Sequence, residues 1–180
     1  MGEGMKCRTG ITYFLRENVT GAENDECAFS FDRTADRFVF RFLVKDADII
    51  SPYRADNEDL FDGDAVEVFI APQGDRKRYF ELDVSPYGVR FWASVVNETG
   101  TDIDVERLAP VYAVKTMLTQ DGYRAEIELP FAALHGLDTE KYLFNAYRLD
   151  KKSDGRQLLY ALNPTLCDRF HRPKYFVAEE

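Results

Sequence analysis

The sequence has little cysteine, no long apolar run and only one short stretch with helical character. Its three cysteines, Cys7, Cys27 and Cys167, form no CxxC pair, so their number and spacing predict neither a disulfide framework nor a zinc site. The densest apolar run, FVFRFLV, contains Arg41 and is far shorter than the ~20 residues that cross a bilayer. Disulfide-rich and membrane-spanning classes are therefore excluded, and we expect a soluble protein.

An excess of basic residues is also missing. The 180 residues carry 23 Lys and Arg against 32 Asp and Glu, and 23 − 32 gives a net charge of −9. This balance argues against nucleic acid and against an anionic membrane surface as partners. The opening MGEGMKCRTGITYFLREN has none of the three regions of a signal peptide. As written, the sequence predicts a cytoplasmic protein, and an extracellular one if an export signal precedes it.

Hydrophobic residues recur mainly with period two, which predicts an all-β protein. Strand-like runs cover residues 27–32, 37–45, 64–71, 78–85, 88–96, 111–120, 122–129, 142–150, 158–163 and 175–178. Short turn sequences such as Gln120-Asp121-Gly122 favour antiparallel pairing, and two packed sheets would bury the apolar faces. We expect one domain over residues 1–180, an antiparallel β-sandwich of the immunoglobulin or jelly-roll kind. Residues 1–25 are expected to be irregular, and residues 130–136 (PFAALHG) to form one short helix.

Alternation along three of these runs predicts a polar sheet face. Val66, Val68 and Ile70 alternate with Glu67, and the next run alternates in the same way. The predicted polar face carries Glu67, Tyr79, Glu81, Asp83, Arg90 and Trp92. Aromatic plates beside charged groups are suited to sugars, which offer an apolar C–H face and a ring of hydroxyls. An ordinary polar outer face with Trp92 at the core edge is the alternative interpretation of the same pattern.

Charge is separated along the chain. Residues 46–64 hold seven carboxylates and one arginine (1 − 7 = −6), whereas residues 148–174 hold seven basic and three acidic residues (7 − 3 = +4). The two segments could pair structurally. Oxygen ligands are what calcium prefers, so a structural calcium site is a further hypothesis for the acidic segment. Its candidate ligands are Asp46, Asp48, Asp56, Asp59, Asp62 and Asp64.

Several segments together resemble the family 9 carbohydrate-binding modules of the DOMON-like β-sandwich superfamily. They are, in order, ECAFSFDRTADRFVFRFLVKD, LFDGDAVEVFIAP, YFELDVSPYG, AEIELPFAAL, FNAYR and LNPTLCDRFHRPKYFV. The resemblance implies sugar binding without catalysis, in polysaccharide metabolism. By position it assigns sugar contacts to Phe61, as the stacking aromatic, and to Glu67. It assigns further contacts to Arg90 and to Asn163, with Asn145 as an alternative to Asn163.

The predicted carbohydrate site thus comprises Phe61, Glu67, Glu81, Arg90, Trp92, Asn145 and Asn163, with no catalytic residue. Two alternatives remain open. Some DOMON-like domains hold haem for electron transfer, for which only Met117, His135 and His171 could serve as ligands. A glycoside hydrolase would use Glu67 together with Glu81 or Asp83. The sequence leaves the sugar, the linkage and the oligomeric state open.

Overall fold

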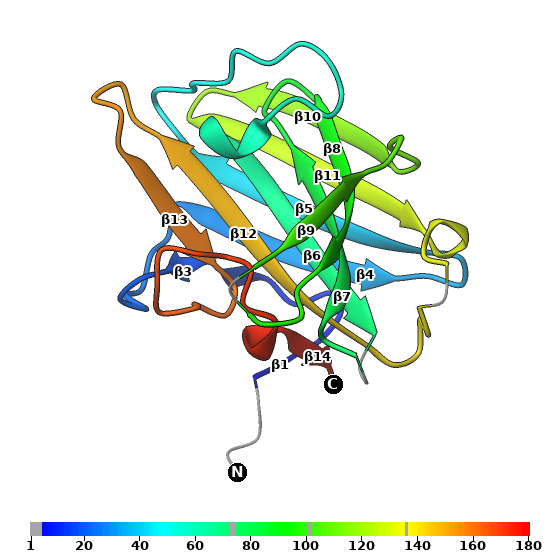
Figure 1. The fold of residues 1–180 in the computed structure, drawn as a ribbon. Helices are drawn as coiled ribbons and strands as arrows, with labels where there is room; N and C mark the ends of the chain where they lie inside the picture. Colours follow the sequence, from blue (N-terminus) through cyan, green and yellow to red (C-terminus); the bar gives the residue numbers. More distant parts are fainter. Residues whose placement is uncertain (1–4, 73–74, 101, 136) are drawn as a thin grey trace.

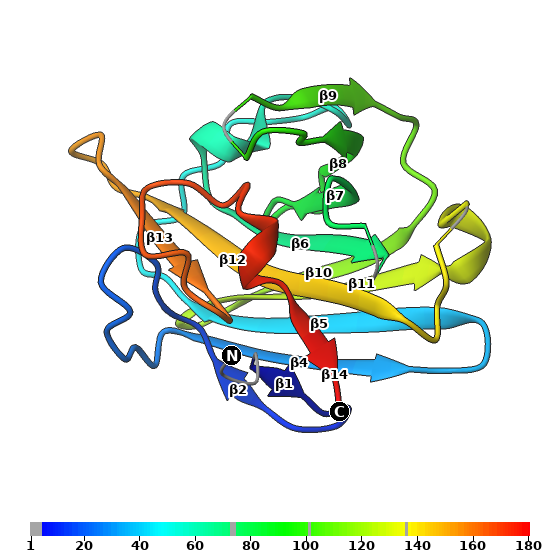
Figure 2. The same ribbon diagram turned by 60° about the horizontal axis from the view of Figure 1, so that its bottom comes forward.

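The computed structural model describes residues 5–72, 75–100, 102–135 and 137–180, which form two packed sheets (Figures 1 and 2). The larger sheet contains nine strands and the smaller one five. The strands of the larger sheet are β1 (Lys6–Cys7), β3 (Arg16–Glu17), β6 (Ala65–Pro72), β7 (Arg78–Val84), β8 (Arg90–Val96), β9 (Asp104–Arg107), β12 (Tyr142–Lys151), β13 (Gln157–Ala161) and β14 (Val177–Glu179). Those of the smaller sheet are β2 (Tyr13–Phe14), β4 (Cys27–Arg33), β5 (Arg37–Lys45), β10 (Ala113–Thr119) and β11 (Gly122–Pro130). The predicted all-β sandwich is confirmed.

Short hairpins join some neighbouring strands, whereas others that pair, such as β6 and β12, are far apart in the sequence. The main path of the larger sheet is β1-β14-β12-β6-β7-β8-β9. Strand β12 pairs with β14 near its start and with β13 near its end, along the same edge, and β3 pairs with β13. The smaller sheet has the order β10-β11-β5-β4-β2. Among the described residues, β1 and β14 form the one parallel pair. The hairpin expected over residues 27–45 is present as β4 and β5.

One hairpin depends on a glycine. Strands β10 and β11 pair from Thr119 opposite Gly122, with Gln120 and Asp121 between them. Gly122 has φ +151°, and a Cβ there would lie 2.1 Å from the carbonyl oxygen of Val44. A side chain at this position would therefore collide with β5, which explains why the turn ends in glycine.

The core between the sheets is aromatic. Phenylalanines of β4 and β5 pack against the inner face of β6 and β12, as in the pair Phe31 and Phe144, whose ring centroids are 4.8 Å apart. Trp92 of β8 lies in the same core, stacked on Phe80 at 4.9 Å with the ring planes 3° apart. This packing is what alternation predicts for the inward faces of a sandwich.

The larger sheet is buried on its outer face as well. A second apolar cluster there includes Phe69, Tyr79 and Tyr147, and Phe170 and Phe176 of the C-terminal segment pack on them. Figure 2 shows this segment, in red, crossing beside β12 and β13. Strands β6 and β12 are consequently buried along almost their whole length.

Helical structure is limited to three short 3-10 turns within the described residues. They are η1 (Leu60–Asp62), η2 (Phe131–Ala133) and η3 (Pro173–Tyr175). The helix expected over residues 130–136 is thus reduced to η2, because one turn suffices to connect β11 with the next segment, and Gly136 lies outside the described residues. The N-terminal stretch contains three two-residue strands. No helix in the described ranges is long and apolar enough to cross a bilayer.

Candidate functional site

A pocket of about 650 Å³ opens on the outer face of the larger sheet. Glu67 of β6 and Glu81 of β7 line its base, and Phe61 of η1 lines its rim with 57% of its surface exposed. Its apolar walls are Phe69, Ile103, Leu149, Leu159 and Phe170. The remaining lining residues include Gly100, Gln157 and the C-terminal stretch Asp168, Arg169 and His171. The pocket therefore has an acidic base and mainly apolar walls.

Three carboxyl groups cluster at this base. Glu67 lies directly opposite Asp83 in the β6–β7 ladder, and Glu81 lies opposite Phe69 two residues further on. Glu67 is 2% exposed, Glu81 7% and Asp83 still less. Within the described part of the chain, the carboxylates of Glu67 and Glu81 make no hydrogen bond, and Oδ1 of Asp83 is buried without a partner. Buried acids without donors are costly, which marks this base as a place for a ligand.

Burial and mutual repulsion change how these acids titrate. Burial raises the pKa of Glu81 to about 8, although the Arg107 charge acts in the opposite direction. The pKa of Glu67 is raised by burial and by the Glu81 charge, and that of Asp83 by burial and by both glutamates. Carboxyl groups of this kind retain protons at a pH where exposed glutamates have lost them. Perturbed acids in a concave pocket are typical of functional sites.

His171 holds the C-terminal segment against the pocket. Its Nδ1 lies 2.7 Å from the Tyr79 hydroxyl, and its ring packs 4.9 Å from that of Phe69. The side-chain amide of Asn97 donates to the His171 carbonyl oxygen at 3.1 Å. Burial lowers the pKa of His171 to about 4, so the imidazole is neutral near pH 7. Although Nε2 is 3.9 Å from the Glu81 carboxylate, it brings no positive charge to the base.

Three of the predicted site residues meet in this pocket. Phe61, Glu67 and Glu81 come from η1, β6 and β7, and all three line it. The predicted polar face is therefore real for β6 and β7. It is nevertheless buried, because the C-terminal segment and the loop before β6 cover the sheet.

Arg90 and Trp92 lie elsewhere, and the prediction that they share the face of Glu67 is wrong. In the β7–β8 ladder, Trp92 is opposite Leu82, whereas Ala93 is opposite Glu81. Trp92 is 2% exposed in the core between the sheets. The Arg90 guanidinium bonds Asp56 at 2.6 Å and the Tyr112 carbonyl oxygen at 3.0 Å. Alternation within β8 did not show which side chains point into the core, because the neighbouring residues Phe91 and Trp92 are both large and apolar.

Asn145 and Asn163 lie outside the pocket lining and fix the chain around it. The Asn145 amide donates to the Asn163 carbonyl oxygen at 2.9 Å and accepts from the Asn163 backbone N–H at 3.1 Å. The Asn163 amide donates to the Tyr175 carbonyl oxygen at 2.8 Å. These bonds make both asparagines positioning residues for the C-terminal segment. Neither has the predicted place in the pocket lining.

The sequence interpretation missed the residues that close the pocket. Phe170 stacks on Tyr147 at 4.2 Å, and its carbonyl oxygen accepts from the Tyr147 hydroxyl at 3.2 Å. The available signal was the run DRFHRP, in which two aromatic rings stand among charges without strand periodicity. Such a pattern is typical of a segment that packs through single side chains.

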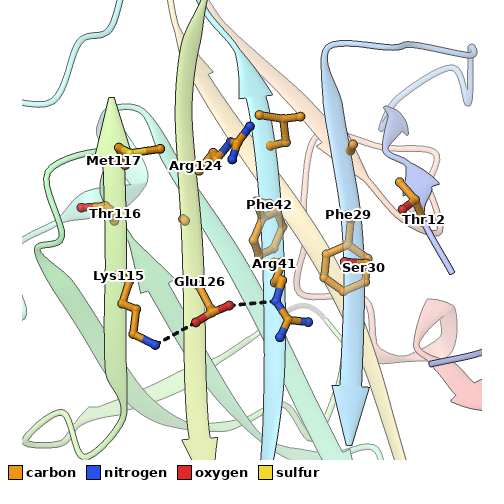
Figure 3. Close-up of a pocket in the computed structure, with 13 residues that line it drawn as sticks. Thr12, Phe29, Ser30, Arg41, Phe42, Lys115, Thr116, Met117, Arg124 and Glu126 are labelled. Carbon is orange, nitrogen blue, oxygen red and sulfur yellow. Dashed lines mark hydrogen bonds and ion pairs between the residues drawn. The ribbon is translucent and has the colours of Figure 1, made fainter. Parts of the chain in front are cut away.

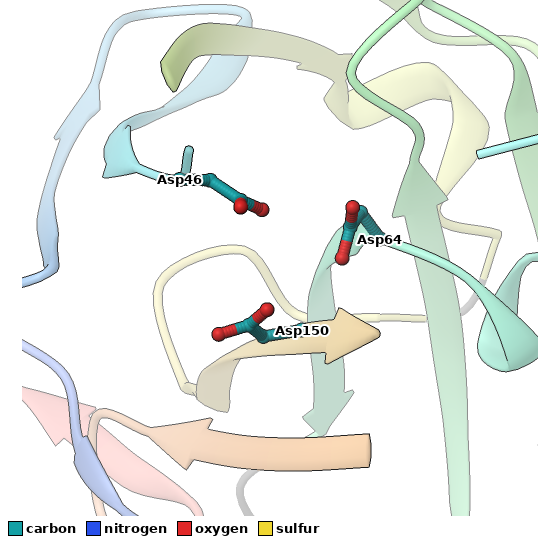
Figure 4. Close-up of side chains that lie close together, drawn as sticks. All are labelled: Asp46, Asp64 and Asp150. Atoms are coloured by element: carbon teal, nitrogen blue, oxygen red, sulfur yellow. The ribbon is translucent and has the colours of Figure 1, made fainter. Parts of the chain in front are cut away.

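A second acidic cluster lies at the ends of β5 and β12. Ligand oxygens of Asp46, Asp64 and Asp150 lie within 4.8 Å of one another (Figure 4). Nη2 of Arg148 is 3.4 Å from Asp46 and 3.2 Å from Asp150, and Nζ of Lys152 is 2.8 Å from Asp150. Burial raises the pKa of Asp64 to about 6, although backbone N–H groups of Ile50 and Lys151 donate to it.

The acidic and basic segments do pair, as one interpretation of the charge pattern expected. Lys151 bonds Asp62 at 2.7 Å, and Arg148 lies against Asp46. Of the six calcium candidates, Asp46 and Asp64 meet, with Asp150 as an unpredicted third. The others lie apart from them: Asp56 pairs with Arg90, Asp59 with Arg107 and Asp62 with Lys151, while Asp48 is exposed.

A second hollow of about 450 Å³ crosses the outer face of the smaller sheet (Figure 3). Lys115 of β10, Glu126 of β11 and Arg41 of β5 form a row of ion pairs across it, at 3.1 and 2.8 Å. Met117 lies beside this row and is exposed.

The haem candidates are not brought together. Met117 lies on the outer face of the smaller sheet, His171 is on the outer face of the larger one, and His135 lines a third hollow beside Phe80 and Trp92. These residues do not fit a haem with paired axial ligands.

The fold and the pocket together define a class, a β-sandwich module with a pocket on the outer face of one sheet. Residues 7–176 match the family model described as carbohydrate family 9 binding domain-like, and the chain belongs to this family. No curated protein matches it significantly.

Solved structures share the fold. A candidate carbohydrate-binding protein from Bacteroides uniformis superposes with a TM-score of 0.74 at 17% identity, over 93% of this chain and 84% of that one. A family 9 carbohydrate-binding module from Caldicellulosiruptor kristjanssonii in complex with glucose gives a TM-score of 0.64 at 13% identity, over 99% and 96%. The cellotriose complex of a family 9 module from the same organism gives 0.63 at 14%, over 98% and 91%.

Proposed function

We propose that this chain binds carbohydrate, without catalysis, in the pocket formed by Phe61, Glu67 and Glu81. The observation that carries the proposal is a pair of buried glutamates to which no described group donates, in a pocket with an exposed aromatic ring at its rim. Sugar hydroxyls donate to carboxylates, and the C–H face of a sugar packs on an aromatic plate. Family membership and the glucose and cellotriose complexes of related modules support the same ligand class.

Isothermal titration with glucose and cellotriose tests the proposal. We expect saturable binding by the wild-type chain and a loss of at least about tenfold in affinity in Glu67→Gln, since the amide N–H groups replace an acceptor oxygen and an unsatisfied buried partner costs about 1–3 kcal/mol. Glu126→Gln is the matched control, because it makes the same change on the opposite sheet. Absence of binding to a wider panel of neutral and charged sugars, with the melting temperature intact, would contradict the proposal.

The geometry favours binding over hydrolysis. A glycosidase needs one protonated carboxyl and one ionised carboxylate on opposite sides of the scissile bond. Here the pKa values of all three acids are raised, and the acids lie side by side on adjacent strands. We therefore expect no release of reducing sugar from cello-oligosaccharides. Release that is abolished in Glu67→Gln would establish an enzyme instead.

Structural calcium at Asp46, Asp64 and Asp150 stays a prediction. Their oxygens suit calcium, but Arg148 and Lys152 already offset two of the three negative charges. A rise in melting temperature with calcium chloride that EDTA reverses and Asp64→Asn abolishes would support the ion. An unchanged melting temperature would mean that the two cations suffice.

A further inference from the structure

The base of the pocket is rich in acceptors and poor in donors. Glu67 and Glu81 offer carboxyl oxygens to which no described group donates, whereas two nearby donors are at least partly engaged elsewhere. The Gln157 amide donates to the Gly63 carbonyl oxygen at 3.1 Å, and Nδ1 of His171 is bonded to the Tyr79 hydroxyl. Where these carboxyls are ionised they only accept, so a neutral sugar hydroxyl, which both donates and accepts, would find only half of its partners there.

The base also lacks positive charge. Arg107, whose charge acts on Glu81, is ion-paired with Asp59, and its guanidinium lies over the Phe91 ring at 5.4 Å. His171 is neutral for the reason given above, and Arg169, the arginine of the pocket lining, is exposed and forms no ion pair with the buried acids. Among the described residues, no lysine or arginine forms an ion pair with these three buried acids. Either protons or a cationic ligand must compensate them.

We propose, on the basis of the carbohydrate-binding function above, that the pocket prefers a sugar with a free protonated amine, such as a 2-amino-2-deoxyhexose unit. An ammonium group has three donors and no acceptor, which is the complement of the Glu67 and Glu81 oxygens. Aromatic faces near the acids, Phe61 at the rim and Phe170 in the wall, favour a cation further. Acetylation of the amine would remove the charge that the base requires.

Binding of the ammonium group displaces a proton. Without ligand, the raised pKa values keep protons on these carboxyls. An ammonium group placed between the carboxyls compensates their negative charge in place of a proton, which is released. The titratable or charged groups that face them are Asp83 and Tyr79 of β7, Tyr147 of β12, Arg107 of β9 and His171. Asp168 and Arg169 stand in the exposed part of the lining. Asp83 shares the excess of protons, and the raised pKa values of Tyr79 and Tyr147 keep both phenols neutral.

The experiment is titration calorimetry of the full chain with glucosamine, glucose and N-acetylglucosamine at neutral pH. Each titration is repeated in two buffers of different ionisation enthalpy, so that proton release is measured directly. We expect glucosamine to bind about tenfold or more tighter than glucose, which corresponds to about 1.4 kcal/mol. Proton release should accompany glucosamine only, and N-acetylglucosamine should bind no better than glucose.

Two variants locate the amine. Glu81→Gln should reduce the preference for glucosamine over glucose to about twofold or less and remove the proton release. Glu126→Gln, on the opposite sheet, should leave both unchanged, and melting temperatures confirm that each variant is folded. Equal affinity for glucose and glucosamine would overturn the amine preference while the proposed function stands. Absence of binding to every sugar would overturn both, and a preference that survives Glu81→Gln and Glu67→Gln would place the amine elsewhere.

Discussion

The two hollows on opposite faces of the sandwich use acidic residues in opposite ways. On the smaller sheet, Glu126 and Glu128 are bonded by Lys115, and Arg41 and Arg37 add one bond each. On the larger sheet, Glu67 and Glu81 are buried with no donor among the described residues. The first arrangement is complete in itself, whereas the second is completed only by a proton or a ligand. In this molecule, buried acids without a described donor therefore mark the proposed binding site, whereas the exposed row of ion pairs does not.

The pKa values express the same contrast. For Glu126, burial opposes ionisation, but bonds from Lys115 and Arg41 outweigh it and lower the pKa. Bonds from Lys115 and Arg37 lower the pKa of Glu128. For the acids of the pocket, burial dominates and raises the pKa. One sheet face thus stays ionised at neutral pH, and the other resists ionisation.

The largest expected effect is the difference in stability lost when a buried arginine or an exposed arginine is replaced. Arg148→Met leaves Asp46 buried without its arginine partner and Asp150 with Lys152 alone, so we expect a loss of about 3–5 kcal/mol in the free energy of unfolding. Arg41→Met, in the exposed row of ion pairs, should cost only about 0–1 kcal/mol. Urea denaturation of both variants measures the difference. Equal losses would mean that burial does not distinguish the two networks.

Phe61→Ala should weaken sugar binding by about 1–3 kcal/mol and leave stability nearly unchanged, because the ring is exposed at the rim. Trp92→Ala makes the counterpart change in the core and should cost about 3–5 kcal/mol of stability. Calorimetric titration and thermal unfolding of both variants separate the two roles. A strongly destabilised Phe61→Ala would show that this ring supports the fold.

The smallest expected effect is a pH dependence. The unfolded chain releases the Glu81 proton near pH 4.5, whereas the folded chain keeps it until about pH 8. Over that interval the folded state binds more protons, so the free energy of unfolding falls as the pH rises. Glu81→Gln should remove at least about 1 kcal/mol of this fall, and Glu126→Gln none of it. Melting temperatures measured across this range would contradict the assignment if the two variants had parallel profiles.

The strands and much of the pocket base could be predicted because alternation reports burial directly. Val66, Val68 and Ile70 point inward, which places Glu67 on the other face whatever covers it. In β8 the rule failed, because neighbouring positions carry Phe91 and Trp92 and only the pairing of Trp92 with Leu82 decides the direction. The cover formed by Phe170 and His171 could not be predicted, since single side chains on an irregular backbone produce no hydrophobic periodicity in the sequence.

The hydrogen bonds of Asn145, Asn163 and His171 hold the C-terminal segment on the larger sheet, and this has a consequence for the order of folding. The base of the pocket comes from β6 and β7 in the middle of the chain, while its cover comes from residues 168–171 near the end. Contacts between segments so far apart in sequence form late, because a long loop must close first. We therefore expect the pocket to be completed in the final stage of folding, when the C-terminal segment docks and takes the acids out of water.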